Sequence, residues 1–234
     1  MRVAIGWMAI GLCWGQAPIA APTIGKMLDA SGTLRTVYGV AGNFTVGPQE
    51  AVRVISAACS AEFCLAKTAN RIQGPKTSAM APSGPALFGF DGPDAVVYFP
   101  AAKQFARWHQ GRLLRLAWHV DGEVLALRGT EIAVRRDADV WVVRPDGTIL
   151  DYLGEVAGPV LLLDGAAVLA SEDALVLRRP ARDDVRFELS GIQRLSALGS
   201  EYVQVETAAG SYALRSTPGR EDLLLLPTLR GGRH

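Results

Sequence analysis

The segment Glu123–Leu153 constrains the fold of this chain most strongly. It contains four apolar runs of five to eight residues, read as EVLALRG, TEIAVRR, DADVWVVRP and DGTILDYL. Turn signals separate the runs: Arg128-Gly129, the stretch from Arg136 to Asp139, and Pro145-Asp146-Gly147. Apolar and β-branched residues at strand length, with tight-turn residues between them, predict a four-stranded antiparallel meander.

A degenerate form of this unit recurs along the chain. One short run marks each copy: FCLAKT (63–68), AVVYFP (95–100), VWVVRP (140–145), LVLRRP (175–180) and YALRST (212–217, aligned at Ser216). The last aligned residues of these runs, from Thr68 to Ser216, are 32, 45, 35 and 36 residues apart in the sequence. A further apolar run precedes each short run, and another follows it. No unit shows the apolar face of a helix, so helical repeats are excluded. The chain therefore contains about five units with three to four strands each.

Four-stranded antiparallel units at this period resemble the blades of a β-propeller. The opening LDASGTLRTVYGVAGN (28–43) is similar to the start of many secreted bacterial β-propeller proteins, in which a strand, a glycine turn and a Gly-x-x-Gly corner lead into the first blade. There is no G-H…W-D signature and no Gly-Gly kelch pair, so no named subfamily is implied. The resemblance implies an all-β fold, a small propeller of about five four-stranded antiparallel blades. A β-sandwich or an incomplete propeller is the alternative.

The repeats also predict how the chain is divided. We expect a single propeller-like domain over residues 21–230, with blades at roughly 34–75, 76–112, 113–155, 156–190 and 191–227. Residues 22–33 are expected to supply a closing strand, since propellers commonly pair an N-terminal strand with the last blade. KMLDA (26–30) is the candidate, beside DLLLLP (222–227).

Residues 1–20 have the pattern of a secretory signal peptide. Met1-Arg2 is followed by VAIGWMAIGLCWG, an uncharged apolar run, and then by small residues that offer cleavage after Ala20. The run is shorter than a membrane span, which needs about 20 residues, so we interpret it as a cleaved signal. Once it is removed, the mature chain is not expected to span a membrane. A buried N-terminal strand is the alternative. Leu12 before Cys13 departs from the lipoprotein pattern. We therefore predict export to the periplasm or the extracellular space.

Two cysteines remain after the predicted cleavage. Cys59 and Cys64 flank a four-residue hairpin loop, and an exported compartment permits a disulfide between them, with two buried thiols as the alternative. Two cysteines without a nearby histidine do not support a zinc site. The mature chain carries 23 basic and 23 acidic residues, which gives no basic footprint for nucleic acid.

The sequence contains no catalytic motif: no G-x-S-x-G elbow, P-loop or Rossmann fingerprint is present. No cofactor and no metal site are predicted, and the Asp-Gly pairs are interpreted as turns. A cation lies at or near the end of four of the short runs that mark the repeats, which we call the marker runs: Lys67, Arg144, Arg178 (or Arg179) and Arg215. If these positions are equivalent in a ring, the four cations lie on one rim. There they could bind an anionic ligand or the acidic patch of a partner. The simpler interpretation is that they are solvated strand-end charges paired with acids such as Asp137, Asp139 and Asp183.

Three functional hypotheses follow. The first is an exported, non-enzymatic and monomeric scaffold that binds an unknown protein or small ligand. The second is a hydrolase or lyase with its site at the central channel. Several convergent carboxylates there, or a histidine with carboxylates, would favour the enzyme, and an apolar plugged channel would exclude it. The third is a remnant of a larger propeller that needs an oligomeric partner.

Overall fold

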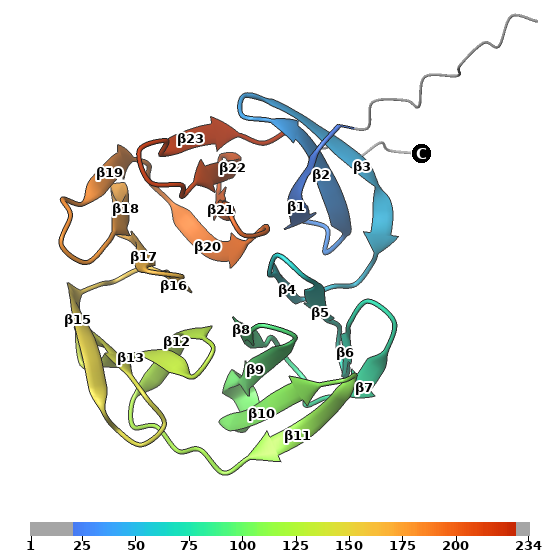
Figure 1. The fold of residues 1–234 in the computed structure, drawn as a ribbon, viewed down its shortest axis with the longest axis vertical. Helices are drawn as coiled ribbons and strands as arrows, with labels where there is room; N and C mark the ends of the chain where they lie inside the picture. The colour runs from blue at the N-terminus through green and yellow to red at the C-terminus, as the bar shows by residue number, and fades with distance from the viewer. Residues whose placement is uncertain (1–20, 228–234) are drawn as a thin grey trace, which may run out of the picture.

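The computed structural model describes residues 21–227, and within them six antiparallel sheets surround a central axis (Figure 1). Apart from one 3-10 turn at Pro100–Ala102, the regular elements are strands. The predicted all-β propeller is therefore confirmed, but it has six blades rather than five. The predicted signal peptide and its cleavage site lie outside the described residues. No helix in the described part of the chain has the length and apolar character needed to cross a membrane.

Five of the six blades have four strands each, and consecutive strands pair with one another. The second blade contains β4 (Ser56–Cys59), β5 (Cys64–Lys67), β6 (Arg71–Gln73) and β7 (Ser78–Met80), and the third contains β8 (Leu87–Asp91), β9 (Asp94–Phe99), β10 (Gln104–His109) and β11 (Arg112–Leu116). The fourth contains β12 (Glu123–Arg128), β13 (Glu131–Arg136), β14 (Asp139–Val143) and β15 (Ile149–Glu155). The fifth contains β16 (Val160–Leu163), β17 (Ala166–Ala170), β18 (Ala174–Arg178) and β19 (Val185–Glu188), and the sixth contains β20 (Ile192–Ala197), β21 (Tyr202–Thr207), β22 (Gly210–Arg215) and β23 (Asp222–Leu225). The predicted ranges 156–190 and 191–227 each match one sheet, and 113–155 contains the whole β12–β15 sheet together with most of β11. The ranges 34–75 and 76–112 cut across sheets.

The first blade has only three strands: β1 (Thr23–Leu28), β2 (Leu34–Val40) and β3 (Asn43–Ala51). Its β1–β2 turn lies at the end of the ring where β5 ends. Val54 N donates to Gly32 O in that turn (2.9 Å), and the next residue, Ile55, donates through its N–H to Lys67 O at the end of β5 (2.7 Å). In the other blades, the first strand and the second strand end at opposite ends of the ring. The three strands therefore run in the directions of a second, third and fourth strand, and the strand next to the axis is missing.

The missing strand changes how the ring closes. The innermost strands β20 and β4, from the sixth and second blades, contact each other directly. The prediction that residues 22–33 pair beside 222–227 is wrong, because β1 pairs with β2 and β23 pairs with β22. The sixth blade instead reaches β1 itself. Lys26 N donates to Leu198 O (2.9 Å), and this close approach requires Gly25, where a Cβ would lie 1.8 Å from the same oxygen.

A side-chain amide completes this closure. Gln204 on β21 accepts a hydrogen bond from Leu28 N (3.0 Å) and donates one to Leu28 O (2.8 Å). Gln204 is only 1% exposed, so both bonds form away from solvent. The inner edge of β1, which would otherwise be an unpaired strand edge, is thus covered by the last blade.

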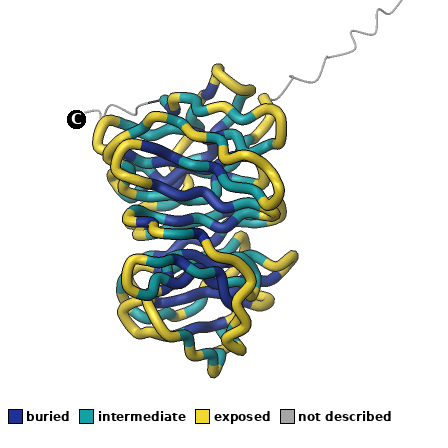
Figure 2. The backbone as a smooth tube through the Cα atoms, turned by 90° about the vertical axis from the view of Figure 1, so that its left-hand side faces the viewer, coloured by how far each residue is buried: buried dark blue, intermediate teal, exposed yellow. Residues whose placement is uncertain are grey.

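The core lies between the blades. Middle strands are covered on both faces, and all six residues of β9 are buried. Figure 2 shows the buried segments within the thickness of the ring and the exposed ones at the turns along its edges. At the tip of the second blade, Cys59 and Cys64 face each other across the β4–β5 hairpin and are joined by a disulfide (Sγ–Sγ 2.02 Å). Cys59 and Cys64 are thus paired across the hairpin, as the four-residue loop between them led us to expect.

Candidate functional site: the central opening

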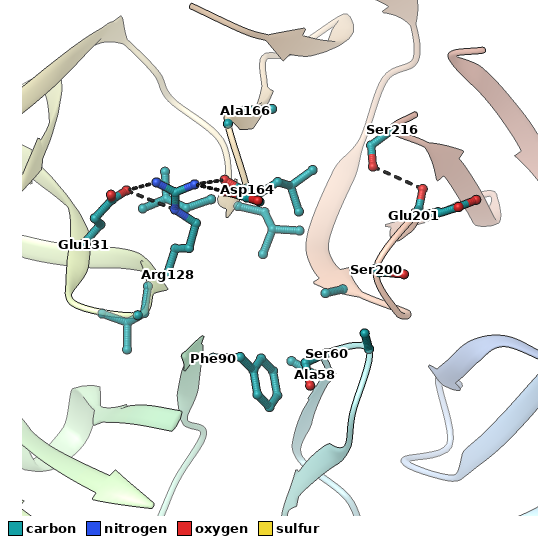
Figure 3. A pocket seen from close by; sticks show the side chains of 18 of the residues that line it. Ala58, Ser60, Phe90, Arg128, Glu131, Asp164, Ala166, Ser200, Glu201 and Ser216 are labelled. Carbon is teal, nitrogen blue, oxygen red and sulfur yellow. Dashed lines mark hydrogen bonds and ion pairs between the residues drawn. The ribbon is translucent and has the colours of Figure 1, made fainter. Parts of the chain in front are cut away.

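Five turns converge on the axis at one end of the ring. In the four-stranded blades, the first strand ends at this end, and the turns to the second strands surround a cavity of about 1010 Å³ (Figure 3). We call this cavity the central opening. The turns that line it contain Ala61, Gly92, Gly129, Gly165 and Ser200, and two loops between third and fourth strands complete it, through Arg179 to Arg182 and Ser216 to Pro218. The three-stranded first blade contributes no residue to it.

The turn chemistry brings these loops close to the axis. Asp164-Gly165 forms a two-residue loop between β16 and β17, with Gly165 at φ 62°. Gly129 takes a similar conformation (φ 53°) between β12 and β13. Left-handed conformations of this kind favour glycine and suit the twist of a tight hairpin. The interpretation of the Asp-Gly pair at 164–165 as a turn is therefore confirmed.

Arg128 connects the fourth and fifth blades at the edge of the opening. Its Nε and Nη2 donate to Glu131 Oε2 (3.0 and 2.5 Å), while Nη1 donates to Leu163 O (2.9 Å) and Asp164 Oδ1 (3.0 Å). Figure 3 shows the guanidinium between the two carboxylates. Four charge-assisted or backbone hydrogen bonds of this kind fix the side chain in one geometry. The charge of Arg128 is thereby neutralised by carboxylates of the protein itself.

Arg179 forms the corresponding link between the fifth and sixth blades. Its Nη1 donates to Glu221 Oε1 (2.7 Å), its Nη2 donates to Ser216 O, and the two charged side chains are 9% and 13% exposed. Backbone N–H groups, first that of Glu221 itself, together with Arg179 hold the pKa of the Glu221 carboxyl below its usual value. This loop is consequently held in place by a largely buried ion pair.

Other lining groups are free to meet a ligand. Asp91 and Arg182 line the opening and form no ion pair within residues 21–227. Phe90 lies on the same edge, held edge-to-face against Phe63 with ring centroids 5.1 Å apart (Figure 3). The opening therefore offers an anion, a cation and an aromatic face on a rigid frame.

Four carboxylates line the opening, each from a different blade: Asp91, Glu131, Asp164 and Glu201. Two of them are engaged by Arg128, and the Glu201 side chain points away from the opening, while its carbonyl oxygen accepts a bond from Ser216 Oγ (Figure 3). Within the described residues, no group of three or more histidine, cysteine, aspartate or glutamate side chains is placed to hold a metal ion. The carboxylates are thus spread around the rim and do not gather at one point.

Among the cations selected from the sequence, Lys67 is the exception in place and burial. It is 0% exposed, and its Nζ donates to Thr68 O (2.5 Å) and Ala69 O (3.0 Å). Burial lowers the pKa of the Lys67 ammonium. Lys67 is the last residue of the second strand in its blade, whereas the three arginines end or directly follow third strands. Neighbouring antiparallel strands end at opposite ends of the ring. The structure therefore does not bring all four cations to one rim.

The three arginines lie at the end of the ring that holds the opening, yet none of them lines it. Arg144 is exposed after β14, and Arg215 is half-buried at the end of β22. Arg178 binds Asp184 (3.0 Å) and donates to Leu153 O of the neighbouring blade (2.9 Å), so it stabilises a blade interface. A ligand-binding role for these four cations stays a prediction.

Comparisons with known proteins identify the fold only. No family model matches the sequence, and no curated protein matches it. A solved structure of a protein of unknown function from Bacteroides caccae is similar at a TM-score of 0.53 and 12% identity, over 84% of this chain and 91% of that one. PorZ, a surface component of the type-IX secretion system of Porphyromonas gingivalis, matches at 0.49 and 12%, over 89% of this chain and 39% of that one. The extracellular domain of the putative one-component system BT4673 from B. thetaiotaomicron matches at 0.46 and 11%, over 90% and 34%. The chain thus spans less than two fifths of each of the last two proteins. The similarity to the Bacteroides caccae protein shows a shared fold.

Proposed function

We propose that the protein is an exported, non-enzymatic and monomeric scaffold that binds a protein segment or small ligand at the central opening. The observation that carries this proposal is the convergence of turns from five blades on one cavity of about 1010 Å³. This volume is at the upper end of the range of about 300–1,000 Å³ that is common for ligand sites. Sites of this kind combine apolar walls with a few fixed polar groups.

Preorganisation supports a binding role. Arg128 and Arg179 each join two neighbouring blades through several hydrogen bonds, so the loops around the opening are held by the ring itself. Rigid lining groups lose little conformational freedom when a ligand binds, and this raises affinity. Asp91, Arg182 and Phe90 then supply the contacts that distinguish one ligand from another.

Two features support export. The N-terminal sequence has the pattern of a secretory signal, and the β4–β5 hairpin carries a disulfide. Structural disulfides persist in oxidising compartments and are rare in the cytosol. Fractionation of a bacterial host that produces the full chain tests this part: the mature form should leave the cytoplasm with the cysteine pair resistant to alkylation until it is reduced.

Site-specific photo-cross-linking tests the binding site. A benzophenone-bearing residue is placed in the full chain at Thr130 or Ser200, which are exposed at the opening, or at the exposed Glu188 on β19 as a matched control. We expect light-dependent adducts, seen by gel and intact mass in the exported fraction, from both opening positions and none from Glu188. Adducts of equal yield from Glu188, or none from either opening position, would contradict the proposal. A dimer mass in light scattering would contradict the monomer.

A hydrolase or lyase at the same opening is the second candidate, because the Asp91 and Asp164 carboxylates line the opening from neighbouring parts of the ring. An enzyme of this kind requires turnover, which the scaffold does not predict. Chromogenic glycosides and lactones incubated with the purified protein distinguish the two. Turnover that is lost in both Asp91→Asn and Asp164→Asn, with folding retained, would establish the enzyme and refute the scaffold.

A further inference from the structure

A second cavity lies at the opposite end of the ring. Its volume is about 660 Å³, and its lining includes Leu87, Val124 and Val160, at or near the starts of β8, β12 and β16. Since the central opening lies where the innermost strands end, this cavity is separated from it by the length of those strands. It involves the third, fourth and fifth blades and is independent of the proposed function. We call it the aromatic pocket.

Three aromatic rings form one wall of the aromatic pocket. Tyr98 and Phe105 have ring centroids 4.5 Å apart, and Trp118 packs against Phe105 at 5.7 Å. Phe105 is 2% exposed and serves as the base of the wall, while Trp118 is half-buried and keeps part of its surface accessible. Rings in such tilted contact hold each other in place. The wall is therefore a fixed apolar face beside an open cavity.

Polar groups without protein partners surround this wall. The Tyr98 hydroxyl makes no hydrogen bond within residues 21–227, although the residue is only 8% exposed, and burial raises the pKa of that phenol. Lys103, His119 and Asp121 line the same cavity, and none of them forms an ion pair in the described part of the chain. At the central opening, by contrast, Arg128 binds both Glu131 and Asp164. The aromatic pocket thus holds free donors and acceptors of both kinds beside an apolar face.

We propose that the aromatic pocket binds a pyranose unit of a neutral oligosaccharide. A pyranose ring presents an apolar face of C–H groups, which packs on an aromatic ring, and a rim of hydroxyls that both donate and accept hydrogen bonds. Trp118 supplies the face. The Tyr98 hydroxyl, Lys103 and His119 supply donors, and Asp121 supplies an acceptor. A strongly charged ligand fits less well, because the free side chains carry opposite charges.

Calorimetric titration of the full chain with maltohexaose, cellohexaose, xylohexaose and mannohexaose, each up to about 5 mM, tests this proposal. We expect at least one of the four to bind. Trp118→Ala should weaken that binding at least tenfold. Tyr98→Phe keeps the ring and removes only the hydroxyl, so it should weaken binding about three- to tenfold, the effect of one lost hydrogen bond.

Trp141→Ala is the matched control, since Trp141 is also half-buried and is stacked on another ring, Tyr152, outside the pocket. It should leave saccharide affinity unchanged, and circular dichroism should show that all three variants are folded. If Trp118→Ala fails to fold, Tyr98→Phe decides alone. Absence of binding for the whole panel would overturn the proposal, as would equal affinity of the wild type and Tyr98→Phe. Binding of N-acetyltyrosinamide but of no saccharide would assign the pocket to an aromatic side chain and overturn it as well.

Discussion

Replacing Gln204 by leucine tests how this propeller closes. The Gln204 amide is 1% exposed and joins the sixth blade to the first through Leu28 N (3.0 Å) and Leu28 O (2.8 Å). Leucine has a similar size and fills the same space, but it forms no hydrogen bond. The variant therefore leaves the packing nearly intact and removes both polar contacts of the junction.

The expected loss follows from the two backbone groups left behind. A buried donor or acceptor without a partner costs about 1–3 kcal/mol, so the free energy of unfolding should fall by about 2–5 kcal/mol, less a small gain from burying leucine. A domain of this size has roughly 5–15 kcal/mol in total. With about 2–4 °C per kcal/mol for chains of 150–250 residues, the melting temperature should fall by roughly 5–20 °C.

Urea unfolding followed by tryptophan fluorescence measures the loss, and Gln193→Leu is the control. Gln193 is exposed on β20 of the same blade, so its replacement should change stability by less than about 0.5 kcal/mol. Native-state hydrogen exchange adds a local readout. In Gln204→Leu, the amides of β1 should exchange faster than those of the middle blades, because the junction opens first.

Either of two results would refute this reasoning. Equal stability of Gln204→Leu and Gln193→Leu would show that the amide contributes nothing to closure. A fall in stability without faster exchange in β1 would show that the amide supports the sixth blade alone and that the first blade is held by apolar contacts.

Three further outcomes are expected. Reduction of the Cys59–Cys64 disulfide should lower the free energy of unfolding by about 2 kcal/mol in urea titrations, because the closed loop is short. Gly25→Ala should destabilise the protein far more than Gly42→Ala in thermal unfolding, since both glycines have positive φ but only the first has backbone at the place of a Cβ. Burial alone would raise the pKa of Asp94, yet hydrogen bonds from His109 and Arg107 hold that pKa below its usual value. The stabilisation is therefore present above about pH 4 and lost as pH falls through the lowered pKa, so Asp94→Asn should destabilise near pH 7 and destabilise progressively less as pH falls below about 4.

The repeat period predicted the architecture because each blade repeats the same local chemistry: a short apolar strand and a tight turn. It gave the wrong blade count because no marker run falls in the three-stranded first blade, and it misplaced blade boundaries because the marker runs were not equivalent. FCLAKT and AVVYFP are the second strands β5 and β9, whereas VWVVRP, LVLRRP and YALRST are the third strands β14, β18 and β22. The interval of 45 residues spans this change. Aligned correctly, the second strands from Cys64 to Tyr202 start 30 to 37 residues apart.

The first blade was divided between a closing strand and the start of the next unit. Nothing local marks it as a separate sheet, because its three strands are joined by short turns like those of the other blades. Its position depends on Gln204 and Leu28, which are 176 residues apart in the sequence. Contacts at such separation leave no periodic trace, and the missing innermost strand is visible only as a reversal of strand direction in space.

The same ambiguity explains why the candidate site differs from the predicted one. In a ring of antiparallel blades, the turn after each first strand lies nearest the axis, so functional residues should be sought there. Arg128 ends the first strand directly before that turn in the fourth blade, while Arg144 follows a third strand further from the axis. Both are arginines at the end of an apolar run before a turn, and the sequence alone does not say which strand is the first. A repeat protein therefore reveals its unit before its site, and the site becomes predictable only once the strand order within the unit is known.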